Sequence, residues 1–267
     1  GCTSLKKIDV LDAKTIGYGA FLDCTALEKV SFSDDLPESI DDDSFVNTAL
    51  VNNHKDGVVY IDDIALCYKE PEKPATSIKI KSGTKHIAAD CLYDIPSVKS
   101  IYLPSSLETV ETGNFGYYGN HLLDRVYITG LKTEFKGRVP HGCTYYILPK
   151  AYKVLDYFDN GDYNYTTNWN PDKTKSVSAV GKTKSTAKIT WKKQGYVSGY
   201  EVYMKTSKNG SWKKVATLKG SDSTSYTQKG LSKNKTYYFR VRAYKTVYDK
   251  TYYGAYSTTD AAKTKKK

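Results

Sequence analysis

Apolar side chains recur along the first half of the chain at a nearly constant interval. Four short segments resemble one another, and each ends in an apolar anchor: Phe21, Phe45, Leu92 and Phe115. One period of about two dozen residues runs through these anchors, with a single double-length step between Phe45 and Leu92. Such a period is typical of a solenoid, in which each unit buries its apolar face only against its neighbours.

Each repeat combines a turn with a short strand. A helical turn is expected around an Ala-Phe-x-x-Cys segment, and the strand that follows directs alternate side chains into the core. The first two repeats match at one constant offset in the pairs Cys2/Cys24, Leu5/Leu27, Ile8/Val30 and Val10/Phe32. Further strands are expected at Ile78/Ile80, Ile101/Leu103, Val126/Ile128 and 145–148, and a helix started by proline over 149–158.

The double-length step has a pattern of its own. Residues 57–68 predict a β-hairpin that turns near Asp62-Asp63 and is inserted into one repeat. After Ile128 the repeat pattern decays, as expected where a solenoid ends on a polar face.

In the second half the pattern changes to short strands at regular spacing. Seven short strands in about 90 residues favour an antiparallel sandwich. Between two of them, Asn209-Gly210 predicts a type I′ hairpin turn. The strands are expected over 177–180, 187–191, 199–205, 212–218, 225–227, 237–244 and 254–257.

Charge changes sharply between the two halves. Residues 1–174 carry 18 lysines and arginines against 25 aspartates and glutamates, a net charge of −7, whereas residues 175–267 carry 22 against 4, a net charge of +18. Such a jump marks a domain boundary. Lysine outnumbers arginine 36 to 4, which argues against tuned recognition of phosphate groups or nucleic-acid bases, where the planar fork of arginine is preferred.

The repeat pattern I-x-x-x-A-F-x-x-C-x-x-L-x-x-I-x-L-P resembles the BspA-like (treponemal-type) leucine-rich repeats of bacterial surface proteins. The resemblance covers roughly residues 2–160 and is clearest over 16–40 and 87–110. The run L-x5-Y-x-F-R-V-R-A, with Leu231 and with Tyr237 as a tyrosine corner, resembles a fibronectin type III domain. The fold class implied is mainly β: a short leucine-rich-repeat solenoid followed by an immunoglobulin-like β-sandwich.

The domain boundaries follow from these patterns. We expect the solenoid over 1–167, with its hairpin at about 57–68, and a polar, proline-containing linker over 168–175. The fibronectin type III domain is expected over 176–262, and 263–267 is expected to start a further linker. No run of 18 apolar residues is present in the sequence, so no membrane span is expected in it.

The five cysteines leave three alternatives open. Cys2 and Cys24 occupy equivalent core positions, and later repeats place Thr48, Ile95 and Tyr118 there, which favours buried, reduced thiols. One disulfide is the second alternative, because an odd cysteine count in a secreted chain calls for a check of pairing. Catalytic use of a cysteine is the least favoured.

The other candidate chemistry is weak. The histidines at 54, 86, 121 and 141 lack metal-ligand spacing, and the Gly-Tyr-Val-Ser-Gly segment at 195–199 places its serine one position late for a nucleophile elbow. The aspartates at 34–35 and 41–43 lack the ordered spacing of a calcium loop. We therefore expect no enzyme, no cofactor and no metal.

The basic sandwich admits two interpretations. Its surplus positive charge would attract polyanions, such as anionic wall polymer or a host glycan. Its aromatic residues fall at strand positions, which favours a lysine-coated spacer over a surface that stacks nucleic-acid bases.

The sequence thus predicts a non-catalytic binding protein that is extracellular, either secreted or on the bacterial cell surface. By resemblance, the repeat domain would adhere to host proteins, glycans or other cells. The expected partner is a host extracellular protein or glycan, or bacterial wall polymer, with no nucleic acid and a monomeric chain. Two alternatives stay open: an accessory or spacer region of a larger extracellular hydrolase, and a purely structural stalk. The candidate contact residues are Tyr60, Tyr68, Tyr102, Tyr117, Tyr118 and Tyr127.

Overall fold

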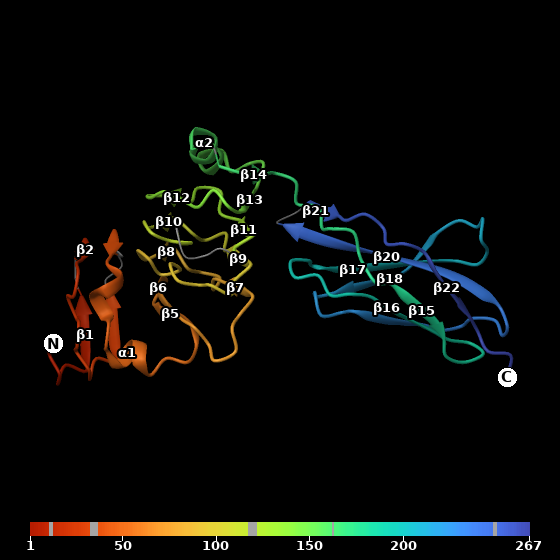
Figure 1. The fold of residues 1–267 in the computed structure, drawn as a ribbon, viewed down its shortest axis with the longest axis horizontal. Coiled ribbons are helices and arrows are strands. Elements are labelled where there is room, and N and C mark those ends of the chain that lie inside the picture. The colour runs from red at the N-terminus through yellow and green to blue at the C-terminus, as the bar shows by residue number, and fades with distance from the viewer. Residues whose placement is uncertain (11–12, 33–36, 117–121, 162, 248–249) are drawn as a thin grey trace. The chain divides into compact units, whose positions relative to one another are not determined.

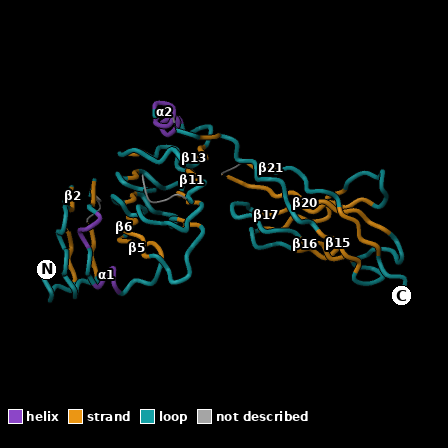
Figure 2. The backbone as a smooth tube through the Cα atoms, viewed as in Figure 1, coloured by secondary structure: helices purple, strands orange, loops and turns teal. Residues whose placement is uncertain are grey.

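The chain divides into two compact units, the repeat unit (Gly1–Thr167) and the sandwich unit (Asn168–Lys267). The computed structural model describes residues 1–10, 13–32, 37–116, 122–161, 163–247 and 250–267. Both units are built mainly from strands (Figure 1), and the helical segments drawn in purple in Figure 2 are short. The mainly β fold class, with stacked coils followed by a sandwich, is confirmed. None of the helices in the described ranges has the length and apolarity needed to cross a membrane.

The repeat unit is a stack of parallel coils whose strands form two larger sheets. The sheet of order β14-β13-β11-β9-β7 contains β7 (Ser77–Lys79), β9 (Ser100–Leu103), β11 (Arg125–Ile128), β13 (Thr144–Ile147) and β14 (Tyr165–Thr166). The sheet of order β12-β10-β8-β6-β5 contains β5 (Gly57–Ile61), β6 (Ile64–Lys69), β8 (His86–Ile87), β10 (Thr109–Val110) and β12 (Glu134–Phe135). The first two repeats pair β1 (Lys7–Val10) with β3 (Lys29–Phe32), and β2 (Thr15–Ile16) with β4 (Ser39–Ile40).

The strand register confirms the predicted repeat. Lys7 lies opposite Lys29 in the parallel pair β1–β3, which is the offset predicted from the sequence. The anchors also follow one another, because Phe21 stacks on Phe45 with ring centroids 5.1 Å apart. In a later pair of coils, the amide of Phe115 donates to the carbonyl of Leu92. Equivalent anchor positions of neighbouring coils therefore lie next to one another in both pairs, as expected for a stacked solenoid.

The predicted hairpin forms, and it is more than an insertion. β5 and β6 pair antiparallel and turn at Asp62-Asp63. β6 also pairs in parallel with β8, where Ile64 lies opposite His86, which is the same offset as between the first two repeats. The second strand of the hairpin is thus a regular member of the ladder, and β5 adds one antiparallel strand at its edge.

Helical structure in the repeat unit differs from the prediction in two respects. Within the described coils, the expected helical turn is regular only around the 3-10 helix Asp42–Phe45, which is followed by α1 (Ala49–Asn52). The terminal helix, expected over 149–158, is α2 (Tyr152–Asn160). Pro149 lies before it in a turn closed by the Ala151 amide on the Leu148 carbonyl, where proline suits the second position of the turn better than the helix.

The sandwich unit has two antiparallel sheets. The smaller contains β15 (Ser178–Gly181), β16 (Ala187–Thr190) and β19 (Ser225–Gln228). The larger contains β17 (Gly199–Lys205), β18 (Lys213–Lys219), β20 (Thr236–Val247), β21 (Lys250–Tyr253) and β22 (Asp260–Lys263). Trp191, Tyr200 and Phe239 are buried between them. The tyrosine corner is present as predicted, because the Tyr237 hydroxyl accepts a hydrogen bond from the Ser232 amide at 2.9 Å.

Two local predictions in the sandwich unit are wrong. Residues 254–257 are not a strand but the connection between β21 and β22. The turn at Asn209-Gly210 is closed by the Gly210 amide on the Ser207 carbonyl, and neither Asn209 nor Gly210 has the positive φ of a type I′ turn. A type I′ turn suits a hairpin loop of two residues, because its twist matches that of the two strands. β17 and β18 are joined by a longer connection, which need not match their twist.

The two segments predicted as linkers belong to the sandwich unit. In the first, the Gln194 side chain donates to the Asp172 carbonyl at 2.8 Å. In the second, Thr264 is buried, and its hydroxyl donates to the Ser232 carbonyl at 2.7 Å. Hydrogen bonds therefore hold both segments to the sandwich.

Candidate functional site

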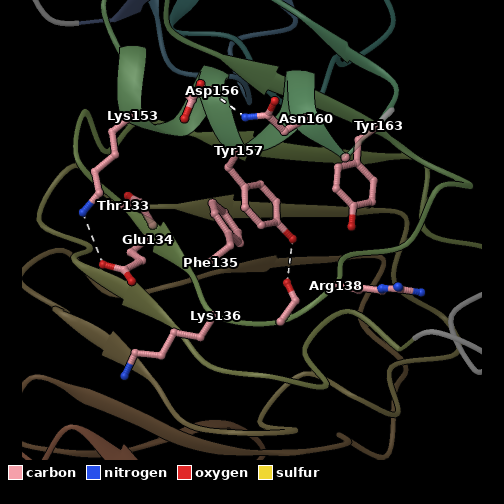
Figure 3. A pocket seen from close by; sticks show the side chains of 12 residues that line it. Thr133, Glu134, Phe135, Lys136, Arg138, Lys153, Asp156, Tyr157, Asn160 and Tyr163 are labelled. Atoms are coloured by element: carbon pink, nitrogen blue, oxygen red, sulfur yellow. Dashed lines mark hydrogen bonds and ion pairs between the residues drawn. The ribbon is translucent and has the colours of Figure 1, made fainter.

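A groove lies between β12 and α2 in the repeat unit (Figure 3). Its volume is about 660 Å³. We call it the cap groove. Its principal lining side chains come from β12, the segment after it, α2 and the residues that follow α2: Phe135, Lys136, Arg138, Lys153, Tyr157 and Tyr163.

The amphipathic pattern of α2 creates one wall of the cap groove. Val154 and Phe158 are the buried residues of the helix. Lys153, Asp156, Tyr157 and Asn160 line the groove, at a spacing that places four side chains on one helical face. The helix thus covers the end of the repeat core and presents a mixed aromatic and polar face beside β12.

Aromatic rings form the floor of the cap groove. The Phe135 and Tyr157 rings stack with centroids 5.3 Å apart, and the Tyr157 and Tyr163 rings are nearly parallel at 5.6 Å. The Tyr157 hydroxyl donates to the Gly137 carbonyl at 2.6 Å (Figure 3). A Cβ at Gly137 would lie 2.8 Å from the Thr112 Cα, so this position requires glycine. Burial, and next the Tyr163 hydroxyl, raise the pKa of Tyr157, so its phenol stays neutral.

Polar side chains border these rings. Lys153 pairs with Glu134 at 3.2 Å, and Lys136 pairs with Glu111 at 2.9 Å. Within the part of the chain that the structure describes, no carboxylate pairs with Arg138, which is exposed. The groove thus offers ring surface, hydrogen-bonding groups and one guanidinium.

The structure brings two predicted contact residues, Tyr60 and Tyr68, into a second groove beside the hairpin. This hairpin groove has a volume of about 420 Å³. The Tyr60 hydroxyl accepts from the Lys81 amide at 3.0 Å, and the Lys81 Nζ lies 5.8 Å from the centre of the Tyr60 ring. Burial raises the pKa of both tyrosines, so both hydroxyls remain protonated at neutral pH.

Two further predicted residues, Tyr102 and Tyr127, stack on each other in the repeat unit. They lie opposite one another on β9 and β11, with ring centroids 4.9 Å apart. Tyr146 on β13 extends the stack, at 4.6 Å from Tyr127. Burial raises the pKa of Tyr102 and of Tyr127. The two remaining candidates, Tyr117 and Tyr118, lie outside the described residues.

None of the described candidate residues lines the cap groove, whose central residues the sequence prediction missed. One signal was available. Aromatic residues become dense where the repeat pattern decays, and the positions 153, 156, 157 and 160 have the spacing of one helical face. The missed residues are Phe135, Arg138, Tyr157 and Tyr163.

The expectation of a buried, reduced thiol holds for Cys24 but is wrong for Cys2, which lies on the surface. All five are free thiols; Cys24 and Cys91 are buried, whereas Cys2 is exposed. Burial raises the pKa of Cys67 and of Cys143 to about 11, so neither is a nucleophilic thiolate at neutral pH. Among the described residues, no group of histidines, cysteines and acids is placed to hold a metal ion.

Comparison with protein families identifies both units. The family described as BspA type Leucine rich repeat region matches in six copies over residues 1–120 and 53–138. The family described as Fibronectin type III domain matches residues 170–259. Both are non-catalytic binding or structural modules, and both are typical of extracellular proteins. No curated protein matches the chain.

Solved structures provide further similarities. The FN1-FN3 domains of chicken CNTN1 are 17% identical, with 39% of this chain and 34% of that chain covered and a TM-score of 0.31. An Fn3-like protein from Clostridium thermocellum is 26% identical, with 33% and 88% covered and a TM-score of 0.29. The 6th fibronectin type III domain of a human fibronectin type III domain containing protein 3 is 25% identical, with 38% and 92% covered and a TM-score of 0.31.

Proposed function

Because the chain belongs to the BspA type leucine-rich repeat family and carries a fibronectin type III domain, we propose that it adheres to glycans through its repeat unit. In this proposal it is a non-catalytic part of a secreted or cell-surface bacterial protein. The glycans are those of host surfaces or of other cells.

The cap groove is the observation that supports this proposal most directly. Its volume of about 660 Å³ is within the range of small-molecule sites, which combine apolar lining with a few placed polar groups. Tyr157 and Tyr163 offer the apolar, ring-shaped surface that the C–H face of a sugar requires. Arg138, Asp156 and Asn160 offer donors and acceptors for hydroxyl or carboxylate groups.

The hairpin groove is the second contact in this proposal. Tyr60 and Tyr68 line it together with Lys79 and Lys81. A glycan chain could occupy either groove independently, so the two grooves would raise the avidity of the chain for a surface that displays many copies of one sugar.

Binding of the full chain to an array of neutral and acidic oligosaccharides tests the proposal. We expect Tyr163→Ala and Arg138→Ala each to weaken binding by about tenfold or more, because each removes one contact of the groove. Tyr152→Ala is the matched control, because Tyr152 is on α2 but is 76% exposed and outside the groove. Near-ultraviolet circular dichroism verifies that each variant keeps its fold.

Two results would contradict the proposal. The first is a native chain that binds no oligosaccharide, which would favour a stalk or the spacer of a larger hydrolase. The second is a native chain whose binding is weakened equally by Tyr163→Ala and Tyr152→Ala, which would place the contact elsewhere.

A further inference from the structure

Both arginines of the sandwich unit project from one face of its larger sheet. β20 alternates, so that Tyr237, Phe239 and Val241 are buried in the core while Arg240 and Arg242 point outward. The other two arginines of the chain are at positions 125 and 138, in the repeat unit. In a unit that otherwise relies on lysine for positive charge, two adjacent outward arginines are a distinctive feature.

Arg242 is fully partnered. It lies opposite Glu201 on β17, and its Nε donates to the Glu201 carboxylate at 2.8 Å while its Nη2 lies 2.7 Å away from the same group. Glu201 is 3% exposed and also pairs with Lys214 at 2.7 Å. The carboxylate is therefore neutralised within the unit.

Arg240 has no such partner. The residue opposite it on β17 is Tyr203, not an acid. Its guanidinium carbon lies 3.5 Å from the centre of the Tyr256 ring and 4.4 Å from the centre of the Trp212 ring. Its Nε is buried without a hydrogen-bond partner, and across the described ranges no carboxylate pairs with it. The two rings fix the plane of the guanidinium, whose edge is what an anion would recognise.

A second cation shares the same indole. The Lys205 Nζ lies 4.8 Å from the centre of the Trp212 ring and donates to the Lys208 carbonyl. Residues 175–267 contain only four acids, at positions 201, 222, 249 and 260. Two positive charges against one ring, in a unit of net charge +18, create a local potential that favours an oxyanion from outside.

We propose that Arg240 and Lys205, both packed against Trp212, bind a phosphate or sulfate group carried on a sugar or polyol polymer. Stacking on Trp212 and Tyr256 occupies only the two faces of the guanidinium. Because Nε is buried, the Nη groups are the donors that meet the anion, and the two rings already orient them. Nucleic acid fits this site less well, because bases need open ring faces and these rings are covered by cations. The site is in the sandwich unit and does not depend on the function proposed for the repeat unit.

Titrations of the full chain with poly(glycerol phosphate) and with dextran sulfate test the site and distinguish the two esters. We expect Arg240→Gln to weaken binding of at least one polymer by about tenfold, and Arg240→Lys by less, because lysine keeps the charge but loses the fork. Lys188→Gln is the matched control: it removes the same charge from an exposed position on β16, in the other sheet, and should change affinity by less than about twofold.

Equal losses for Arg240→Gln and Lys188→Gln would overturn the proposal, because diffuse charge would then explain the binding. Binding of single-stranded DNA of matched charge at least as tight as that of both polymers would also overturn it, in favour of nucleic acid. So would a native chain that binds neither polymer.

Nuclear magnetic resonance gives a test that does not rely on the fold of a variant. With only four arginines in the chain, the Nε–H region should contain few signals, and Arg240→Lys identifies that of Arg240. Inorganic phosphate or sulfate added to the native chain should shift the Arg240 signal and leave that of Arg242 in place, because Glu201 already occupies Arg242. Equal shifts of both signals, or none, would contradict the site.

Discussion

The tyrosine rings of the two units pack against different kinds of side chain. In the repeat unit, rings pack on rings, as in the stack of Tyr102, Tyr127 and Tyr146. In the sandwich unit, outward rings pack on cations, as Tyr256 does on Arg240. Tyrosine thus forms stacks of aromatic rings in the acidic repeat unit, and it packs against arginine in the basic sandwich unit.

Strand direction explains much of this difference. In-register parallel strands place equivalent positions of successive repeats side by side, so a tyrosine at one strand position becomes a stack. Antiparallel strands pair positions that have no reason to be alike, and here Tyr203 lies opposite Arg240. A repeated sequence therefore places identical side chains in contact, whereas the strands of the sandwich can place a tyrosine against an arginine.

The largest expected effect concerns the ring-on-ring cluster of the repeat unit. Phe158 is fully buried and contacts the rings of Phe135, Tyr145 and Tyr157. Phe158→Ala should lower the free energy of unfolding of the repeat unit by about 3–5 kcal/mol, measured by denaturant titration and far-ultraviolet circular dichroism. All three tryptophans are in the sandwich unit, so tryptophan fluorescence reports the unfolding of that unit. The denaturant midpoint measured by fluorescence should therefore stay the same in this variant. A loss below about 1 kcal/mol would show that the cluster is not a core.

A smaller change in the free energy of unfolding is expected where a tyrosine contributes through its hydroxyl group. Tyr237→Phe keeps the ring but removes the acceptor of the Ser232 amide. The free energy of unfolding of the sandwich unit, followed by tryptophan fluorescence, should fall by about 1–3 kcal/mol. An unchanged midpoint would mean that the ring alone, as in the repeat unit, provides the stability.

The two units should also respond to opposite ends of the pH scale. Burial opposes ionisation of Glu201, but hydrogen bonds from Lys214, Tyr203 and Arg242 outweigh it and lower the pKa of that carboxyl. Its contribution to stability is present above the ordinary glutamate pKa and is lost as pH falls through the lowered value. Melting of the tryptophan signal across acidic pH measures this loss, and a Glu201→Gln variant should show less of it.

In the repeat unit, burial raises the pKa of Cys67 and of Cys143 to about 11. The stability that this shift represents is complete below the ordinary thiol pKa and is lost as pH rises through about 11. Burial also raises the pKa of Tyr200 and Tyr244 in the sandwich unit, whose effect begins only near the ordinary tyrosine pKa. Circular-dichroism melts between about pH 8.5 and 10 should therefore move mainly the repeat transition. Alkaline loss confined to the sandwich unit would contradict this assignment.

The smallest expected effect concerns the number of cysteines that react with a thiol reagent in the native chain. Cys2 is exposed, whereas Cys24, Cys91 and Cys143 are buried. At about pH 8 a thiol reagent should label Cys2 quickly and the three buried cysteines only after unfolding. Cys67 is partly buried and its pKa is raised to about 11, so it should react slowly, since the thiolate is the reactive form. Rapid labelling of several cysteines in the native chain would mean that the repeat core is open.

The sequence was sufficient for features that depend on spacing. The constant repeat offset, the hairpin turn at Asp62-Asp63 and the tyrosine corner at Tyr237 are all confirmed, because each follows from a periodicity or from a local turn. The type I′ turn at Asn209-Gly210 failed because its sequence signature holds only for a two-residue loop.

The binding surfaces were harder to predict. Tyr60 and Tyr68 are found together because they belong to one hairpin, and strand register brings Tyr102 to Tyr127. The cap groove joins Phe135 on β12 to Tyr157 on α2, and no sequence spacing specifies that contact. The Arg240 site likewise needs Trp212 and Tyr256, which are distant from each other in the sequence. Their rings both contact the Arg240 guanidinium only once the chain has folded.

The most direct test of the difference between the units is salt dependence. The full chain would be titrated with a neutral oligosaccharide selected on the array, and with poly(glycerol phosphate) or dextran sulfate, at about 50 and 300 mM salt. We predict that oligosaccharide affinity hardly changes with salt and falls by about tenfold or more in Tyr163→Ala. Polymer affinity should fall steeply with salt and weaken by about tenfold in Arg240→Gln. If salt weakens both ligands equally, or if one variant abolishes both, the two units do not use their aromatic residues in the two ways described.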